Sequence, residues 1–183
     1  FIEHAGWTFA QLKGCSARST RLPLNPVPVF AGLGAALFVR VETFRRIGGF
    51  DPKFFMYSDE TDLCWRVWLS GYEVIFVPAA KVYHVLGGSR QESETFSHKV
   101  SIEFLRNRNV VMMLIKNWGS GYLIRKIPLS LAFTIMRAIF YLLRSDPTKI
   151  CGLSKALIWN ITNLEDTLRS RYSTQGKVRV VTD

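Results

Sequence analysis

The sequence predicts an α/β domain followed by a helical, basic and amphipathic segment. Before about residue 90, short apolar runs are bounded by glycine and proline, as is typical of strands and turns. After about residue 95, apolar residues recur at helical spacing. Charge changes at the same place, from a net +2 in residues 1–85 to a net +8 in residues 86–183. We therefore expect residues 1–95 to form the α/β part and residues 96–183 a helical appendage.

Size and composition indicate a packed protein. A chain of 183 residues is long enough for one domain with a core, and 48% hydrophobic content argues against disorder. The three cysteines are far apart and lack metal-type spacing, which favours buried thiols in a reducing compartment. The first residues include neither an initiating Met nor a signal-peptide pattern, so we expect an N-terminal portion to be missing.

The first 47 residues predict a loop, a strand and a short helix. Closely spaced prolines make residues 1–30 irregular. Residues 31–40 are expected to enter a short apolar strand, where Gly32 and Gly34 allow close approach of a ligand or of a neighbouring strand. One or two helical turns follow over residues 41–47 and end at a Gly-Gly pair.

A longer helix is predicted next, and two short strands follow it. Ser58 suits the N-cap of a helix over residues 59–70, with Gly71 just beyond its C-terminus. Residues 73–77 are expected to form a strand, and residues 81–84 a second extended piece.

The basic part predicts three helices. The first covers residues 96–117, and the second covers residues 122–143 with a proline inside it and Arg137 near its centre. The uninterrupted apolar part of the second helix is shorter than the roughly 20 residues that span a bilayer, so we expect it to lie in the membrane plane or to be packed. A third helix begins at Asp146-Pro147 and keeps its apolar spacing to Leu168.

Three acidic residues, Asp59, Glu60 and Asp62, lie at the predicted start of the helix over residues 59–70. The positive end of the helix dipole alone would explain acids at this position. However, there are more acids than a cap requires, and Trp65 and other aromatic residues would shield them from water. A shielded carboxylate with a raised pKa suits a general base. Both interpretations are open at this point.

His84 ends the second extended piece, 24 positions after Glu60. A neutral imidazole is a good ligand for a divalent ion, and carboxylates suit Mg²⁺ or Mn²⁺. A purely structural histidine is the alternative.

Several linked motifs occur along the chain in one order. They are the stretch Gly34–Arg40, Gly48-Gly49-Phe50-Asp51, the run Phe54–Arg66, Gly71-Tyr72, Val77-Pro78, Val82-Tyr83-His84 and Gly87-Gly88-Ser89. Together they resemble family 2 glycosyltransferases, most closely the rhamnosyltransferase-like branch that builds cell-surface polysaccharide. The detailed match covers about residues 31–89, and the helical part resembles the family's C-terminal region more loosely.

The resemblance implies a GT-A fold, a nucleotide-sugar donor, a divalent metal (Mg or Mn) and inverting transfer to a lipid-linked or glycan acceptor. The family's general base falls on Glu60, with Asp59 as the second choice because this chain has Asp-Glu where Glu-Asp is common. The family's histidine, often a metal ligand, falls on His84. The candidates for substrate binding are Gly34, Asp62, Trp65 and Arg66, although Asp62 and Arg66 also form an i,i+4 pair that suits a scaffold.

The family also carries an N-terminal nucleotide-binding βαβ region and an Asp-x-Asp metal motif, and this sequence contains neither pattern. We therefore expect the C-terminal, acceptor-side portion of such an enzyme, inactive by itself, and located at the cytoplasmic face of the cell membrane. The alternative is a non-catalytic, membrane-associated assembly module derived from a glycosyltransferase. Nucleic acid is not an expected partner, because the basic part has no reading motif and no interleaved aromatic residues.

Overall fold

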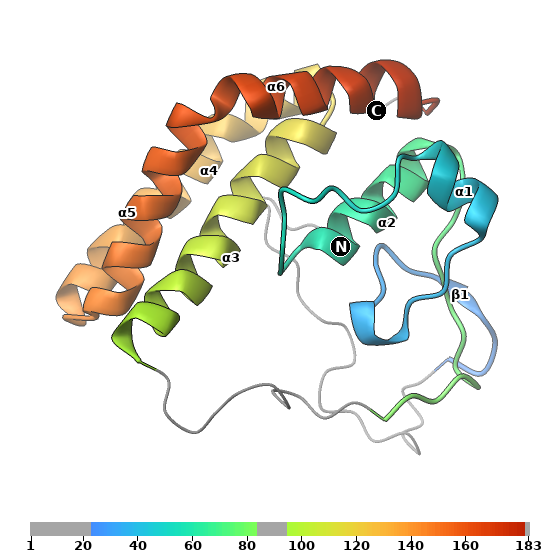
Figure 1. The fold of residues 1–183 in the computed structure, drawn as a ribbon, viewed down its shortest axis with the longest axis horizontal. Helices are drawn as coiled ribbons and strands as arrows, with labels where there is room; N and C mark the ends of the chain where they lie inside the picture. Colours follow the sequence, from blue (N-terminus) through green and yellow to red (C-terminus); the bar gives the residue numbers. More distant parts are fainter. Residues whose placement is uncertain (1–22, 84–94, 182–183) are drawn as a thin grey trace.

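The computed structural model describes residues 23–83 and 95–181, and this part of the chain is mainly helical (Figure 1). Figure 1 shows α3 and α5 side by side, with α4 behind them and α2 on the far side of α3. The elements in chain order are β1 (Val27–Pro28), the 3-10 turn η1 (Gly34–Ala36), α1 (Val41–Arg46), α2 (Asp59–Leu69), β2 (Ile75–Phe76), α3 (Phe96–Asn117), α4 (Ser120–Leu143), α5 (Pro147–Thr162), α6 (Leu164–Ser173) and the π-helical turn η2 (Thr174–Val178).

The sheet is much smaller than predicted. In the described ranges, β1 pairs antiparallel with β2, with Val27 opposite Phe76 and Pro28 opposite Ile75. The prediction of a strand over residues 31–40 is wrong, since η1 lies there instead. The expected strand over residues 73–77 shortens to β2, and residues 81–83 have no regular structure. A strand needs a neighbour for its backbone hydrogen bonds, and the described residues offer no pairing strand to residues 31–40 or 81–83.

The helix predictions are confirmed with one exception. The observed α1, α2 and α3 end within one residue of the predicted ends, and α4 begins two residues early. Gly71 has φ +80° beyond α2, the left-handed backbone expected of a residue just past a helix C-terminus. The exception is the third predicted helix, which is divided at Asn163 into α5 and α6.

One core joins the two predicted parts of the chain. Its buried members come from the loop before α2, from α2 itself and from the end of α3: Phe54, Trp65, Leu69, Met112, Met113, Leu114 and Trp118. The predicted boundary at residue 95 lies just before α3. Helix α3 nevertheless packs into the same core as α2. On its other side, α3 approaches α5 closely at Gly152, where a Cβ atom would lie 2.5 Å from the Cβ of Glu103.

Helix α4 differs from the other helices because none of its residues is buried. Its 24 residues are, by length and composition alone, sufficient to cross a membrane. Arg125, Lys126 and Arg137 nevertheless interrupt its apolar residues, with Arg137 near its centre as the sequence indicated.

Candidate functional site

The acid pair Asp59-Glu60 opens α2, directly after a loop with unusual backbone. Phe55, Tyr57 and Ser58 have φ values of 60°, 69° and 62°, in the left-handed region that non-glycine residues seldom adopt. Ser58 is the N-cap residue of α2, as predicted, but its side chain makes no capping hydrogen bond. An N-cap residue normally has extended backbone, and Ser58 does not.

Two side chains of α3 hold this loop in place. The Nδ2 atom of Asn109 donates to the carbonyl oxygens of Phe54, Met56 and Tyr57 at 3.0, 2.7 and 2.7 Å. The Nη2 atom of Arg108 donates to the carbonyl oxygens of Lys53 and Phe54 at 2.6 and 3.0 Å, and its Nε donates to Asn109. Both side chains are buried, so they fix a strained loop from behind.

Glu60 is half-buried, and its environment favours the protonated carboxyl. Burial, and next a hydrogen bond with the Asp59 carboxyl, raise the pKa of Glu60 from 4.5 to about 7. Gly34 lies against it, since a Cβ atom at Gly34 would be 3.8 Å from the Glu60 Cβ and 3.9 Å from its Cδ. The fold thus brings three of the predicted site residues together: Gly34, Asp59 and Glu60.

An open, largely apolar hollow of about 540 Å³ adjoins Gly34. Its volume is within the range of small-molecule sites. Its lining comes from η1, from α1 and from the segments that flank α1: Gly34, Leu37, Val39, Val41, Phe44, Arg45 and Phe50. Glu60 does not line this hollow itself, but it packs against Gly34, which does.

Asp62, one half-turn further along α2, has 0% of its surface exposed and belongs to a buried ion cluster. Arg66 contacts its Oδ2 through Nε at 2.9 Å and Nη2 at 2.7 Å, and Lys116 contacts the same oxygen at 3.0 Å. Asn117 donates to Oδ1 at 2.8 Å. With these partners, Asp62 has a structural role: it joins α2 to α3.

The ion cluster extends beyond Asp62 to the turn after α1. Arg66 donates to the carbonyl oxygen of Ile47 at 2.7 Å, and Lys116 reaches Asp51 Oδ2 at 2.8 Å. Burial pushes the pKa of Asp51 upward, but the charge and hydrogen bond of Lys116 outweigh this, so its pKa lies below the usual value. The cluster therefore ties the Gly-Gly-Phe-Asp turn to α2 and α3.

Trp65 is a core residue in this arrangement. Its ring meets Phe30 and Trp118 edge to face, with centroids 5.6 and 6.4 Å apart. Of the four residues predicted to bind substrate, Gly34 is beside the acid pair, whereas Asp62, Trp65 and Arg66 are buried and turned inward. Substrate contact by these residues stays a prediction.

The metal prediction involves His84, which lies outside the described residues. Within residues 23–83 and 95–181, no three His, Cys, Asp or Glu side chains come together in a group that could hold a metal ion. Asp59 and Glu60 supply carboxylate oxygens, but these two residues alone do not make a complete Mg²⁺ or Mn²⁺ site. The described residues therefore do not fit the metal by themselves.

Sequence reasoning missed the polar residues of α3 that support the site. Asn109, Lys116 and Asn117 recur at positions i, i+7 and i+8, on the same helix face as the buried Met112 and Met113. Their position among apolar residues on one helix face was the sequence signal that could have identified them. Buried polar groups require partners, and here the partners are Asp62 and the loop before α2.

Comparisons with known proteins identify the family of the chain. Residues 1–162 match the family model described as "Glycosyl transferase family group 2". An N-acetylglucosaminyl-diphospho-decaprenol L-rhamnosyltransferase of Mycobacterium tuberculosis is 39% identical over 67 residues, which are 37% of this chain and 22% of that protein. Rhamnosyltransferase WbbL of Escherichia coli is 35% identical over 66 residues, 36% of this chain and 24% of that protein.

The matched part thus spans less than a quarter of the length of these curated relatives. Comparison with solved structures finds no match. The family model, however, covers most of the chain. The chain therefore belongs to the family 2 glycosyltransferases.

Proposed function

We propose that this chain provides the acceptor-activating side of an inverting glycosyltransferase. The enzyme would move a hexosyl or rhamnosyl group from a nucleotide-sugar donor to a lipid-linked or cell-surface glycan acceptor. The observation that carries the proposal is the half-buried Glu60 carboxyl, which packs against Gly34, one of the residues that line the open hollow. The names of both relatives support rhamnosyl transfer, and the name of the Mycobacterium tuberculosis relative, which includes a lipid diphosphate, supports a lipid-linked acceptor.

The proposed reaction uses Glu60 as the general base. Its carboxylate takes the proton of the acceptor hydroxyl while the hydroxyl oxygen attacks the anomeric carbon of the donor sugar. The bond from that carbon to the diphosphate breaks, and the diphosphate leaves with the electron pair, so the configuration inverts. A base with a pKa near 7 combines a useful ionised fraction with sufficient basicity at neutral pH.

Asp59 has a supporting role in this scheme. Its hydrogen bond with Glu60 helps to raise the pKa of Glu60. The loop before α2 is fixed by Arg108 and Asn109, so the position of Glu60 at the hollow is set by α3. Preorganised geometry of this kind is required of a base that must meet a hydroxyl within hydrogen-bond reach.

The test is Glu60→Gln in the complete enzyme. Loss of a general base lowers turnover by roughly 10²- to 10⁴-fold, and we expect this loss without a change in fold or in donor binding. Glu42→Gln is a matched control, because Glu42 is an acid in the first turn of α1. Turnover of Glu60→Gln within about tenfold of wild type would place the base elsewhere.

The second candidate is a non-catalytic, membrane-associated assembly module derived from a glycosyltransferase. The unburied apolar surface of α4 favours a membrane role under either proposal. The two candidates differ in turnover. A complete wild-type protein that binds lipid vesicles but transfers no sugar from UDP- or dTDP-sugars would support the assembly module.

A further inference from the structure

The outer surface of α4 is apolar along its whole length. Ten apolar side chains are between 44% and 81% exposed: Ile124, Ile127, Leu129, Leu131, Ile135, Met136, Ile139, Phe140, Leu142 and Leu143. A helix of 24 residues is about 36 Å long. An apolar surface of this extent marks an interaction site in a stable protein.

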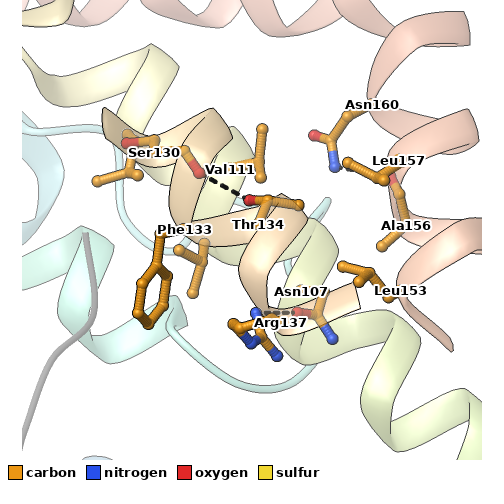
Figure 2. A pocket seen from close by; sticks show the side chains of 12 residues that line it. Asn107, Val111, Ser130, Phe133, Thr134, Arg137, Leu153, Ala156, Leu157 and Asn160 are labelled. Carbon is orange, nitrogen blue, oxygen red and sulfur yellow. Dashed lines mark hydrogen bonds between the residues drawn. The ribbon is translucent and has the colours of Figure 1, made fainter. Parts of the chain in front are cut away.

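The polar edge of α4 faces the protein, which fixes the orientation of the helix. Arg137 Nη1 donates to Asn107 Oδ1 of α3 at 2.8 Å, and its Nε and Nη2 donate to the Tyr141 hydroxyl at 3.1 and 2.6 Å. Figure 2 shows Arg137 and Thr134 beside Asn107 and opposite the α5 side chains, around a cavity of about 40 Å³. The central arginine of α4 is therefore held on the protein side.

The charged residues of α4 are all basic. Residues 120–143 contain Arg125, Lys126 and Arg137 and no Asp or Glu. Arg125 and Arg144 are exposed near opposite ends of α4, and Arg144 lies over the Phe140 ring at 5.3 Å. Basic side chains around an apolar helix face are complementary to anionic lipid headgroups above an acyl layer.

The neighbouring helices exclude a crossing of the membrane by α4 in this arrangement. Helix α3 runs beside α4 and is tied to its middle through Arg137 and Asn107. If α4 crossed the bilayer, α3 would enter the hydrocarbon with its charged residues, which is costly. Those residues are Lys99, Glu103, Arg106, Arg108 and Lys116.

We infer that α4 is an in-plane membrane-binding helix that inserts its outer face into an anionic lipid surface. Insertion covers the exposed apolar side chains, while Arg137 stays against α3. Helix α2, which begins with the acid pair, shares a core with α3, so the acid pair is held at a fixed distance from the lipid surface. This inference is independent of the proposed transfer reaction.

Vesicle flotation of the full chain tests the inference. We expect binding to vesicles of phosphatidylcholine mixed with phosphatidylglycerol, and weaker binding to phosphatidylcholine alone. The double variant Ile135→Glu/Ile139→Glu should lower binding roughly tenfold or more. The matched control Leu24→Glu/Phe38→Glu changes two side chains that are over 90% exposed and lie outside α4, and it should bind as wild type. Equal loss in both variants, or no binding by wild type, would overturn the inference.

Depth measurements separate an in-plane helix from a span. Ile124, Leu131 and Leu142 lie on one helix face, near the two ends and the middle of α4. Each is replaced in turn by cysteine in a chain whose natural cysteines are alanine, and is labelled with a fluorophore that lipid-borne quenchers detect. An in-plane helix gives three similar, shallow depths. A much deeper label at Leu131 would show that α4 crosses the bilayer and would contradict the inference.

Discussion

Glu60 and Asp62 are two positions apart on α2, yet their surroundings differ completely. Glu60 is half-buried beside Gly34 and an open hollow, and its nearest charged neighbour is another acid, Asp59. Asp62 is fully buried and surrounded by donors from Arg66, Lys116 and Asn117. Two carboxylic acids within a single helical turn therefore have a partly exposed setting and a fully buried, ion-paired one.

The difference follows from the direction in which each side chain leaves the helix. Successive helix positions are about 100° apart, so residues two apart point to different sides. The Asp62 side faces α3, where Lys116 and Asn117 complete a buried ion cluster. The Glu60 side faces η1, which offers backbone and apolar atoms but no cation. An acid without a cation in a partly dry setting keeps its proton to higher pH.

The largest expected effect is on stability, through Asp62→Asn. Removing the Asp62 charge leaves buried Arg66 without its acidic partner, although Lys116 keeps Asp51. Breaking a buried ion pair in this way costs about 3–5 kcal/mol of unfolding free energy. Urea denaturation measures the loss. Glu60→Gln, two positions away, should change stability far less at neutral pH. Similar losses of unfolding free energy in Asp62→Asn and Glu60→Gln would contradict the different surroundings of the two acids.

The next effect concerns the loop that precedes the acid pair. Asn109→Leu removes the amide that binds three loop carbonyl oxygens, and unsatisfied buried groups cost about 1–3 kcal/mol. We expect turnover of the complete enzyme to fall as well, because the loop positions Glu60. Asn160→Leu is the control, since this buried amide donates to Ala156 and Arg108 carbonyl oxygens instead. The control should lose stability but keep its turnover; equal loss of turnover would argue against the positioning role.

The smallest effect is a pH dependence of stability caused by Glu60. Its pKa is about 7 in the folded chain, above the ordinary 4.5, so the folded state binds more protons between these values. The stabilisation is therefore complete below about pH 4.5 and is lost as pH rises through about 7. Relative to Glu60→Gln, wild type should be more stable at pH 5 than at pH 8 in urea titrations. A difference that does not change with pH would show that Glu60 has an ordinary pKa.

The sequence predicted local features of the fold well. The helices α1, α2 and α3 follow from apolar spacing and from glycine stops such as Gly71, which act within a few residues. The prediction of a strand over residues 31–40 was wrong because a short run of glycine, alanine and apolar residues has no distinctive hydrophobic period. The break at Asn163 was missed because the apolar spacing continues across it.

The site was predictable only in part, for a related reason. The i,i+4 pair of Asp62 and Arg66 is visible in the sequence and is confirmed by the structure. Lys116 and Asn117, which complete the cluster, are 54 and 55 residues from Asp62. No local pattern identifies contacts at that separation. The sequence therefore indicated a scaffold role for Asp62 but could not identify the α3 residues that complete its cluster.

The central claim is that Glu60 has an environment unlike that of an ordinary surface carboxylate. The most direct measurement is an NMR pH titration of the Glu60 side-chain carboxyl in ¹³C-labelled protein, assigned by its absence in Glu60→Gln. The account predicts an apparent pKa of about 7. A value near the ordinary 4.5 would contradict it and would remove the physical basis for Glu60 as the general base.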